Sequence, residues 1–105
     1  MLSRAEALAR ARELAAAGDL VILRNPQRDL ENLNYDFDDV CDCLQQLEQD
    51  DVDRDMQDQY REGCCVLEFK SVRYGEDELY VKVSVPGDAQ GRLIVLSFKL
   101  WGSPR

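Results

Sequence analysis

Apolar residues recur at helical spacing in three parts of the chain. Ser3 and Glu6 match a capping box, and the apolar positions that follow predict a first helix over residues 4–17. Asp36 can cap a second helix, whose buried face would carry Phe37, Val40, Cys41, Leu44 and Leu47. Residues 49–60 are mostly polar and have larger apolar side chains only at every fourth position, which indicates a short third helix.

Four other segments have the pattern of strands. The apolar run at residues 20–23 predicts an N-terminal strand, and residues 26–35 look like an irregular link. Residues 65–73, 78–85 and 92–101 predict three more strands, because turn-forming residues separate them. We therefore predict an α+β fold: an antiparallel sheet, made of a C-terminal three-strand meander plus one N-terminal strand, packed on one face by two to three helices.

Length and composition indicate one soluble globular domain over residues 1–105. A chain of 105 residues is too short for two well-buried cores, and 45% hydrophobic with 32% charged residues suits a folded protein. The apolar runs are far shorter than the roughly 20 residues that cross a bilayer, and the first residues are charged rather than signal-like. We expect a cytoplasmic protein that makes no contact with a membrane.

Strict alternation assigns the side chains of the predicted strands to two faces. Leu79, Val81 and Val83 would meet the helices, together with Ile94, Leu96 and Phe98 of the last strand. The opposite face of the sheet, called here the open face, would then carry polar side chains: Glu68, Lys70, Tyr80, Lys82, Ser84, Ser97 and Lys99. An ordinary solvated sheet face is the simple interpretation of this set.

The net charge of −8 is concentrated in the middle of the chain. Residues 29–59 carry one basic and twelve acidic side chains, a net −11, whereas residues 1–28 carry +2 and residues 60–105 carry +1. The overall acidity therefore does not exclude a polyanion, because a ligand meets the charge of the face that it approaches. The acidic segment itself is either a solvated helical surface or a docking site for a basic partner.

The chain contains no histidine, which excludes Ser-His-Asp and Cys-His catalysis and histidine-ligated metals. A surface with three lysines and a tyrosine suits RNA, because lysines neutralise phosphates and an aromatic ring stacks on an unpaired base. In RNA the 2′-hydroxyl can attack the adjacent phosphate when its proton is removed, when cations stabilise the transition state and when an acid protonates the leaving 5′-oxygen. Lysine, arginine, tyrosine and glutamate can fill these roles.

The four cysteines lie close together in sequence, as Cys41-x-Cys43 and Cys64-Cys65. This spacing is unlike the framework of a disulfide-rich secreted domain, so reduced thiols are expected. Four thiolates could in principle close a zinc site, but structural sites favour two to four residues between paired cysteines. We expect neither a metal nor a small-molecule cofactor. A thiol redox or zinc protein is the third hypothesis.

Three segments resemble one family of bacterial toxins. YDFDDVCDCLQQLEQDDVDRDM (35–56), LYVKVSV (79–85) and LIVLSFK (93–99) are similar to the MqsR family, which has the RelE-like fold. The resemblance implies a metal-independent endoribonuclease that cleaves mRNA, an mRNA interferase, which a cognate antitoxin protein holds inactive as the other half of a type II toxin–antitoxin pair. The family's proposed active site uses a helix lysine, a glutamine, a strand tyrosine and a lysine of the last strand.

The motifs carry two of these residues over directly, as Tyr80 and Lys99. Arg54 stands at the helix lysine, and Leu67 stands at the glutamine with Glu68 beside it. The candidate catalytic residues are therefore Tyr80, Lys99, Arg54 and Glu68, and the candidate RNA-binding residues are Lys70, Lys82, Ser84 and Ser97. The alternative is a RelE-like module without catalysis, which binds a basic partner through its acidic helices.

Overall fold

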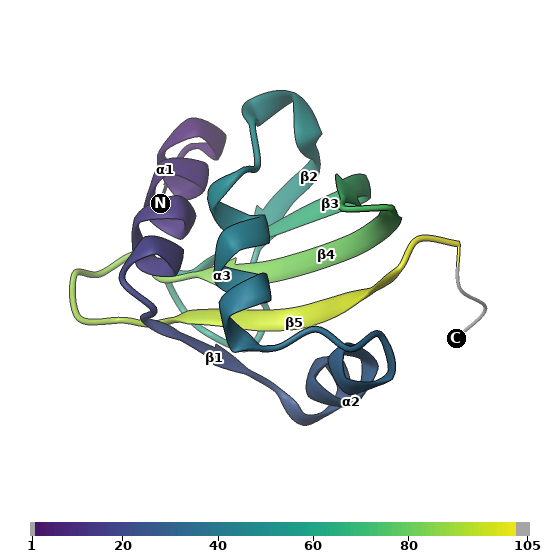
Figure 1. Ribbon diagram of the computed structural model, residues 1–105. Coiled ribbons are helices and arrows are strands. Elements are labelled where there is room, and N and C mark those ends of the chain that lie inside the picture. Colours follow the sequence, from purple (N-terminus) through teal and green to yellow (C-terminus); the bar gives the residue numbers. More distant parts are fainter. Residues whose placement is uncertain (1, 103–105) are drawn as a thin grey trace.

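The structure is a computed structural model, which describes residues 2–102, and it has the predicted α+β architecture (Figure 1). Three α-helices come first, interrupted by one short strand: α1 (Arg4–Ala16), β1 (Leu20–Ile22), α2 (Arg24–Asn32) and α3 (Phe37–Gln45). A single 3-10 turn, η1 (Gln49–Asp51), leads into four consecutive strands: β2 (Val52–Gln57), β3 (Cys65–Tyr74), β4 (Asp77–Val85) and β5 (Leu93–Leu100).

The five strands form one sheet in the order β1-β5-β4-β3-β2. From β2 to β5 each strand is antiparallel to the strand that follows it, and the predicted C-terminal meander is confirmed. The prediction of a wholly antiparallel sheet is wrong, because β1 pairs in parallel with β5. The chain leaves β1 through two helices rather than through a hairpin, and a connection of that length allows parallel pairing.

Helices α1 and α3 cover the same face of the sheet, and α2 lies along the edge where β1 ends (Figure 1). The predicted capping box of Ser3 and Glu6 is present at the start of α1, and the predicted cap Asp36 begins α3, where it bonds reciprocally with Asp39. The core is formed by the covered sheet face and the apolar faces of the helices. Within residues 2–102, the helices are too short and too polar to span a membrane.

Two predicted segments take a different form. Residues 26–35 are not an irregular link, because α2 begins at Arg24 and includes Pro26. Proline is tolerated there, since the first turn of a helix needs no backbone N–H donor, and Leu30 then becomes fully buried. Residues 49–60 are not a helix: after η1 the chain pairs with β3 as an edge strand, and this ladder outweighs the weak four-residue period.

A β-bulge in β5 overturns part of the predicted face assignment. Lys82 pairs with Ser97 and Val83 pairs with Val95, so Leu96 is an extra residue in β5. Leu93, Val95 and Phe98 are therefore buried against the helices, whereas Ile94 and Leu96 lie on the open face. The prediction that Ile94 and Leu96 pack in the core is wrong, because an extra residue moves every side chain before it to the other face.

Two leucines of β5 test the bulge with the same substitution. Leu93→Ala should lower the free energy of unfolding by about 2–5 kcal/mol, since Leu93 is fully buried, and Leu96→Ala should lower it by about 1 kcal/mol or less. Urea denaturation of both variants measures the difference. Uninterrupted alternation gives the opposite order, so a larger loss for Leu96→Ala would contradict the bulge.

Candidate functional site

The candidate site residues lie in register across the open face. Arg54 of β2 pairs with Glu68 of β3, Glu68 pairs with Lys82 of β4, and Lys82 pairs with Ser97 of β5. Two residues further along the strands, on the same face, Tyr80 of β4 pairs with Lys99 of β5. The predicted residues of β2, β3, β4 and β5 thus come together, on the face of the sheet away from α1 and α3.

Glu68 is the buried centre of this group, with 5% of its surface exposed. Arg54 Nε donates a hydrogen bond to one carboxylate oxygen at 2.9 Å, and the Tyr80 hydroxyl donates to the other. Burial by itself raises the pKa of Glu68, but the hydrogen bonds from Tyr80 and Arg54 and the charges of Arg54 and Lys70 outweigh it and hold the pKa below its usual range. Glu68 is therefore ionised at neutral pH.

Tyr80 is the neutral partner of this carboxylate. Burial, followed by the hydrogen bond to Glu68 and its charge, raises the pKa of Tyr80 to about 12. A phenol with this pKa keeps its proton at neutral pH, and a carboxylate with a lowered pKa is a weak base. Glu68 is thus suited to fixing the orientation of Arg54 and Tyr80 rather than to removing a proton from a substrate.

A cation and a second aromatic ring lie on Tyr80. Lys99 Nζ is 5.6 Å from the centroid of the Tyr80 ring, close enough for a cation–π contact. The ring of Trp101 is stacked on Tyr80, with 6.3 Å between centroids and 20° between planes, and 43% of Trp101 is exposed. Sequence reasoning did not include Trp101 in the site, although its position two residues after Lys99 is the signal that could have placed it there.

Not every cation of the open face is equally available. Among residues 2–102, Lys82 and Lys99 form no ion pair, whereas Lys70 Nζ lies 3.3 Å from Asp53 and Arg54 is paired with Glu68. Helix α2 adds Arg28, which lines a hollow of about 300 Å³ together with Ser97 and Lys99. Arg28 was missed because its segment was predicted as a link rather than as a helix beside β5.

Ser84 is the one predicted RNA-binding residue that the structure buries. The loop of residues 58–64 lies over it, and its hydroxyl donates to Asp58 Oδ2 at 2.5 Å. Asp58 Oδ1 accepts from the backbone N–H groups of Tyr60 and Arg61, at 2.8 and 3.1 Å. Burial raises the pKa of Asp58, but these hydrogen bonds outweigh it and lower the pKa. Ser84 therefore anchors a loop and is not a contact surface.

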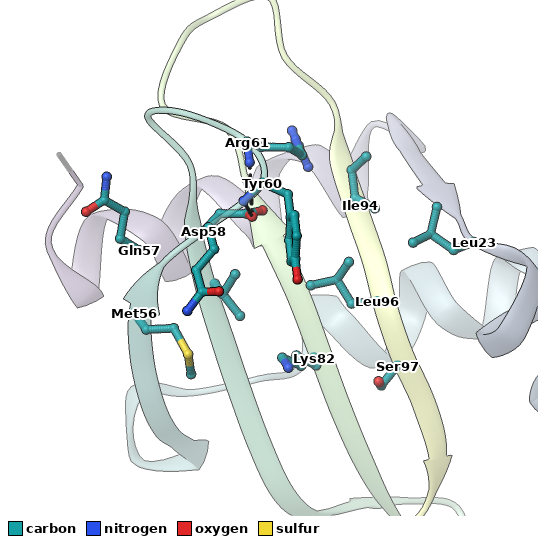
Figure 2. Close-up of a pocket in the computed structure, with 12 residues that line it drawn as sticks. Leu23, Met56, Gln57, Asp58, Tyr60, Arg61, Lys82, Ile94, Leu96 and Ser97 are labelled. Carbon is teal, nitrogen blue, oxygen red and sulfur yellow. Dashed lines mark hydrogen bonds between the residues drawn. The ribbon is translucent and has the colours of Figure 1, made fainter.

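The same loop makes one wall of a groove in the open face, with a volume of about 720 Å³ (Figure 2). Its apolar lining comes from the residue between β1 and α2, from β2, β3 and β5, and from the loop: Leu23, Met56, Tyr60, Val66, Ile94 and Leu96. Its polar lining includes two cations, Lys82 and Arg61, and one carboxylate, Asp58, and is completed by Gln57, Gln59 and Ser97. Ser97 also lines the hollow at Arg28 and the hollow between Tyr80 and Trp101, so the three depressions adjoin one another.

The four cysteines are free and buried. Burial, then the charges of Asp42 and Asp51, raises the pKa of Cys43 to about 12, and burial is also the largest cause of the raised pKa of Cys41 and of Cys65. These three thiols are therefore protonated at neutral pH. A protonated thiol is a poor nucleophile and a poor metal ligand, because the thiolate is the reactive form. No cluster of three metal-ligating side chains occurs within residues 2–102.

A scan against protein-family models finds no match to the chain, and a search of curated proteins finds none either. The resemblance to the MqsR family therefore stays a hypothesis.

The ionised state of Glu68 predicts a pH-dependent effect of Glu68→Gln. A group with a lowered pKa in the folded state stabilises the protein above its unfolded pKa, and this stability is lost as the pH falls through the folded pKa. Glu68→Gln should therefore lower the free energy of unfolding by about 1 kcal/mol at neutral pH, and the difference should shrink progressively as the pH falls below about 4.3, the ordinary glutamate pKa. Urea denaturation across this pH range measures both.

Glu78→Gln is the matched control, because Glu78 is a half-exposed glutamate 3.9 Å from Arg73 on the same sheet. It should change stability little at any pH. An effect of Glu68→Gln that is the same at neutral and acidic pH would contradict the proposed charge state.

Proposed function

We propose that the open face binds single-stranded RNA and cleaves it without a metal ion, and that the protein is the mRNA interferase of a type II toxin–antitoxin pair. One observation carries the proposal: Lys99, a lysine without an ion pair among residues 2–102, lies over the Tyr80 ring, on which Trp101 is stacked. A second such lysine, Lys82, is the next β4 residue on the same face as Tyr80. Cations that hold phosphates and aromatic rings that stack on bases are the two components of single-strand recognition.

The distribution of charge supports this choice of face. Helix α3, with the acidic side chains Asp38, Asp39 and Asp42, packs on the covered side of the sheet (Figure 1). On the open face the carboxylates of Glu68 and Asp58 are buried and hydrogen-bonded, so that their charges are compensated. A phosphate that approaches Lys82 and Lys99 therefore meets a locally favourable field, although the whole chain carries −8.

The reaction that fits these residues is attack of the 2′-oxygen on the adjacent phosphorus. The new O2′–P bond forms as the P–O5′ bond breaks, which leaves a cyclic phosphate and a 5′-hydroxyl. Lys82 and Lys99 stabilise the charge that develops on the phosphoryl oxygens, and Lys99 donates a proton to the leaving 5′-oxygen. Tyr80, held by Glu68, orients the 2′-hydroxyl, whose proton passes to water.

This division of roles follows from the protonation states. Tyr80 has its pKa raised to about 12 and the pKa of Glu68 is lowered, so neither is tuned to accept a proton near neutral pH. Charge stabilisation by fixed cations supplies the larger part of catalysis in this scheme. The proposed partners are mRNA and a cognate antitoxin protein, and the proposed location is the cytoplasm, where both are found.

The second candidate is a non-catalytic module that binds a basic partner through its acidic helices. The observation in its favour is that Asp38 and Asp42 are exposed on α3, together with Glu48 and Asp50 in the turn that follows. Binding of RNA separates the two candidates: it should weaken steeply with salt in the first case, and be absent in the second.

The proposal predicts cleavage of a long mRNA by the purified protein in the presence of a chelator. Lys99→Ala and Tyr80→Phe should each lower the rate by at least roughly a hundredfold, about 2.7 kcal/mol of lost transition-state stabilisation. Gel analysis of single-turnover cleavage gives the rates, and detection of a cyclic phosphate end identifies the reaction.

Tyr74→Phe is the control for Tyr80→Phe, because the Tyr74 hydroxyl also donates to a carboxylate, Asp42 at 2.9 Å, but outside the open face. It should cleave at the parent rate. An intact mRNA with the parent protein, or equal rates for the three variants, would remove catalysis from the open face and favour the second candidate.

A further inference from the structure

Tyr60 is displayed over the groove of the open face rather than packed into the core. It is 94% exposed, the highest value among the exposed large apolar side chains of residues 2–102. Figure 2 shows its ring standing above the sheet on the side of Leu96. A large aromatic side chain that buries so little surface contributes little to folding, and such residues are typical of recognition sites.

The loop that carries Tyr60 is held in place. Asp58 fixes its start through the backbone N–H groups of Tyr60 and Arg61 and through Ser84. The Asp58 N–H donates to the Cys64 carbonyl at 2.9 Å, which closes the loop at its other end. Arg61 is tied to β5, since its Nη2 donates to the Arg92 carbonyl at 3.1 Å. Tyr60 is therefore presented by a braced loop.

The surface opposite Tyr60 is apolar because of the β5 bulge. Ile94 and Leu96 lie on the open face only because the extra residue reverses the alternation, and Val66 of β3 extends the patch. A flat, weakly polar group between the Tyr60 ring and these aliphatic side chains would bury both surfaces. The volume of about 720 Å³ leaves room for such a group and for the backbone attached to it.

Two cations lie beside this apolar patch, and further cations follow toward the proposed cleavage site. Lys82 and Arg61 line the groove, and neither forms an ion pair within residues 2–102. From the Lys82–Ser97 pair the next pair on the same face is Tyr80–Lys99, two residues along the strands and roughly 7 Å away. An anionic chain along β4 and β5 could thus contact the groove and Lys99 at once.

We propose that the groove binds a purine base of single-stranded RNA, stacked on Tyr60, while a neighbouring phosphate lies at Lys99. This inference rests on the proposed function, and it names the base class that the same face would select. A purine offers the larger ring to the stack, and its N7 acceptor suits the donors Lys82 and Arg61. Tyr60 is then a specificity-determining residue, distinct from the residues that act on the phosphate.

The test uses a short 2′-O-methyl oligouridine that carries a single 2-aminopurine, because a 2′-O-methyl strand cannot be cleaved by 2′-oxygen attack. Stacking quenches 2-aminopurine fluorescence. The parent should quench it and bind the strand about tenfold more tightly than it binds all-uridine, whereas Tyr60→Leu should lose the quenching and about tenfold in affinity. Tyr60→Phe should keep both, because the ring and not the hydroxyl makes the stack.

Phe37→Leu is the matched control, since Phe37 is a 43% exposed aromatic residue at the start of α3. It should bind and quench as the parent does. Cleavage of ordinary mRNA is measured in parallel, so that purine binding in the groove and nuclease activity are tested independently.

Equal quenching by the parent and Tyr60→Leu, with mRNA cleavage intact, would overturn the purine site and leave the proposed function standing. Quenching that depends on Tyr60 in a protein that does not cleave mRNA would support the base site and overturn the nuclease. A protein that binds neither oligonucleotide and leaves mRNA intact overturns both, and the apolar groove would then be a surface for a protein partner. A protein that binds neither oligonucleotide but cleaves mRNA overturns the purine site alone.

Discussion

The bulge at Leu96 decides what the open face is made of. Phe98 must face the helices to complete the core, and strict alternation from Phe98 would place Leu96 and Ile94 there as well. The bulge instead gives the core Leu93 and Val95, which are fully buried, and transfers two aliphatic side chains to the opposite face. The side chains of Ser97 and Lys99 follow the bulge and stay in register with β4. One extra residue thus places an apolar patch next to a cationic one.

The second constraint is the buried carboxylate of Glu68. A buried charge is costly unless it is paired and hydrogen-bonded, and Glu68 meets that condition only while Arg54 and Tyr80 both point at it. The hydrogen bond to Glu68 therefore fixes the orientation of the Tyr80 ring. Trp101 stacks on this ring, and Lys99 lies over it. The hydrogen bonds of Glu68 hold in place the residues that would touch a ligand. Residues behind a preorganised site commonly have this role.

The sequence was sufficient where a local pattern determines structure. The capping box at Ser3, the helix cap at Asp36 and the three C-terminal strands were predicted, and so was the common face of Glu68, Tyr80 and Lys99. The errors came from nonlocal effects. Pro26 is a helix breaker in most positions, but it costs nothing in a first turn, so α2 was missed and Arg28 with it. The β2 segment is polar because it is an edge strand, and edge strands carry charge against uncontrolled pairing.

The groove could not be predicted from the sequence, because it too depends on nonlocal effects. Its wall is the loop of residues 58–64, which follows a strand that had been predicted as a helix, and its floor depends on a bulge that alternation cannot detect. Ser84 illustrates the combined effect. Its face was predicted correctly, yet the loop covers it. Its hydroxyl donates a hydrogen bond to Asp58 and is not exposed to solvent. A face assignment identifies which side chains point the same way, whereas accessibility depends on what the rest of the chain places above them.

The separation of charge between the two sides of the sheet bears on both candidate functions. The described part of the protein measures 33 × 23 × 23 Å, so the carboxylates of α3 lie on the order of two Debye lengths from the open face at about 0.15 M salt. Their repulsion of a phosphate chain is then largely screened, while contacts with Lys82 and Lys99 are direct. At low ionic strength the lysine–phosphate contacts are stronger, but the net −8 is less screened and its opposition to a phosphate chain offsets part of that gain. A basic partner on α3 would remove that opposition without covering the open face, whereas a partner that inhibits cleavage must cover Lys99 and the groove themselves.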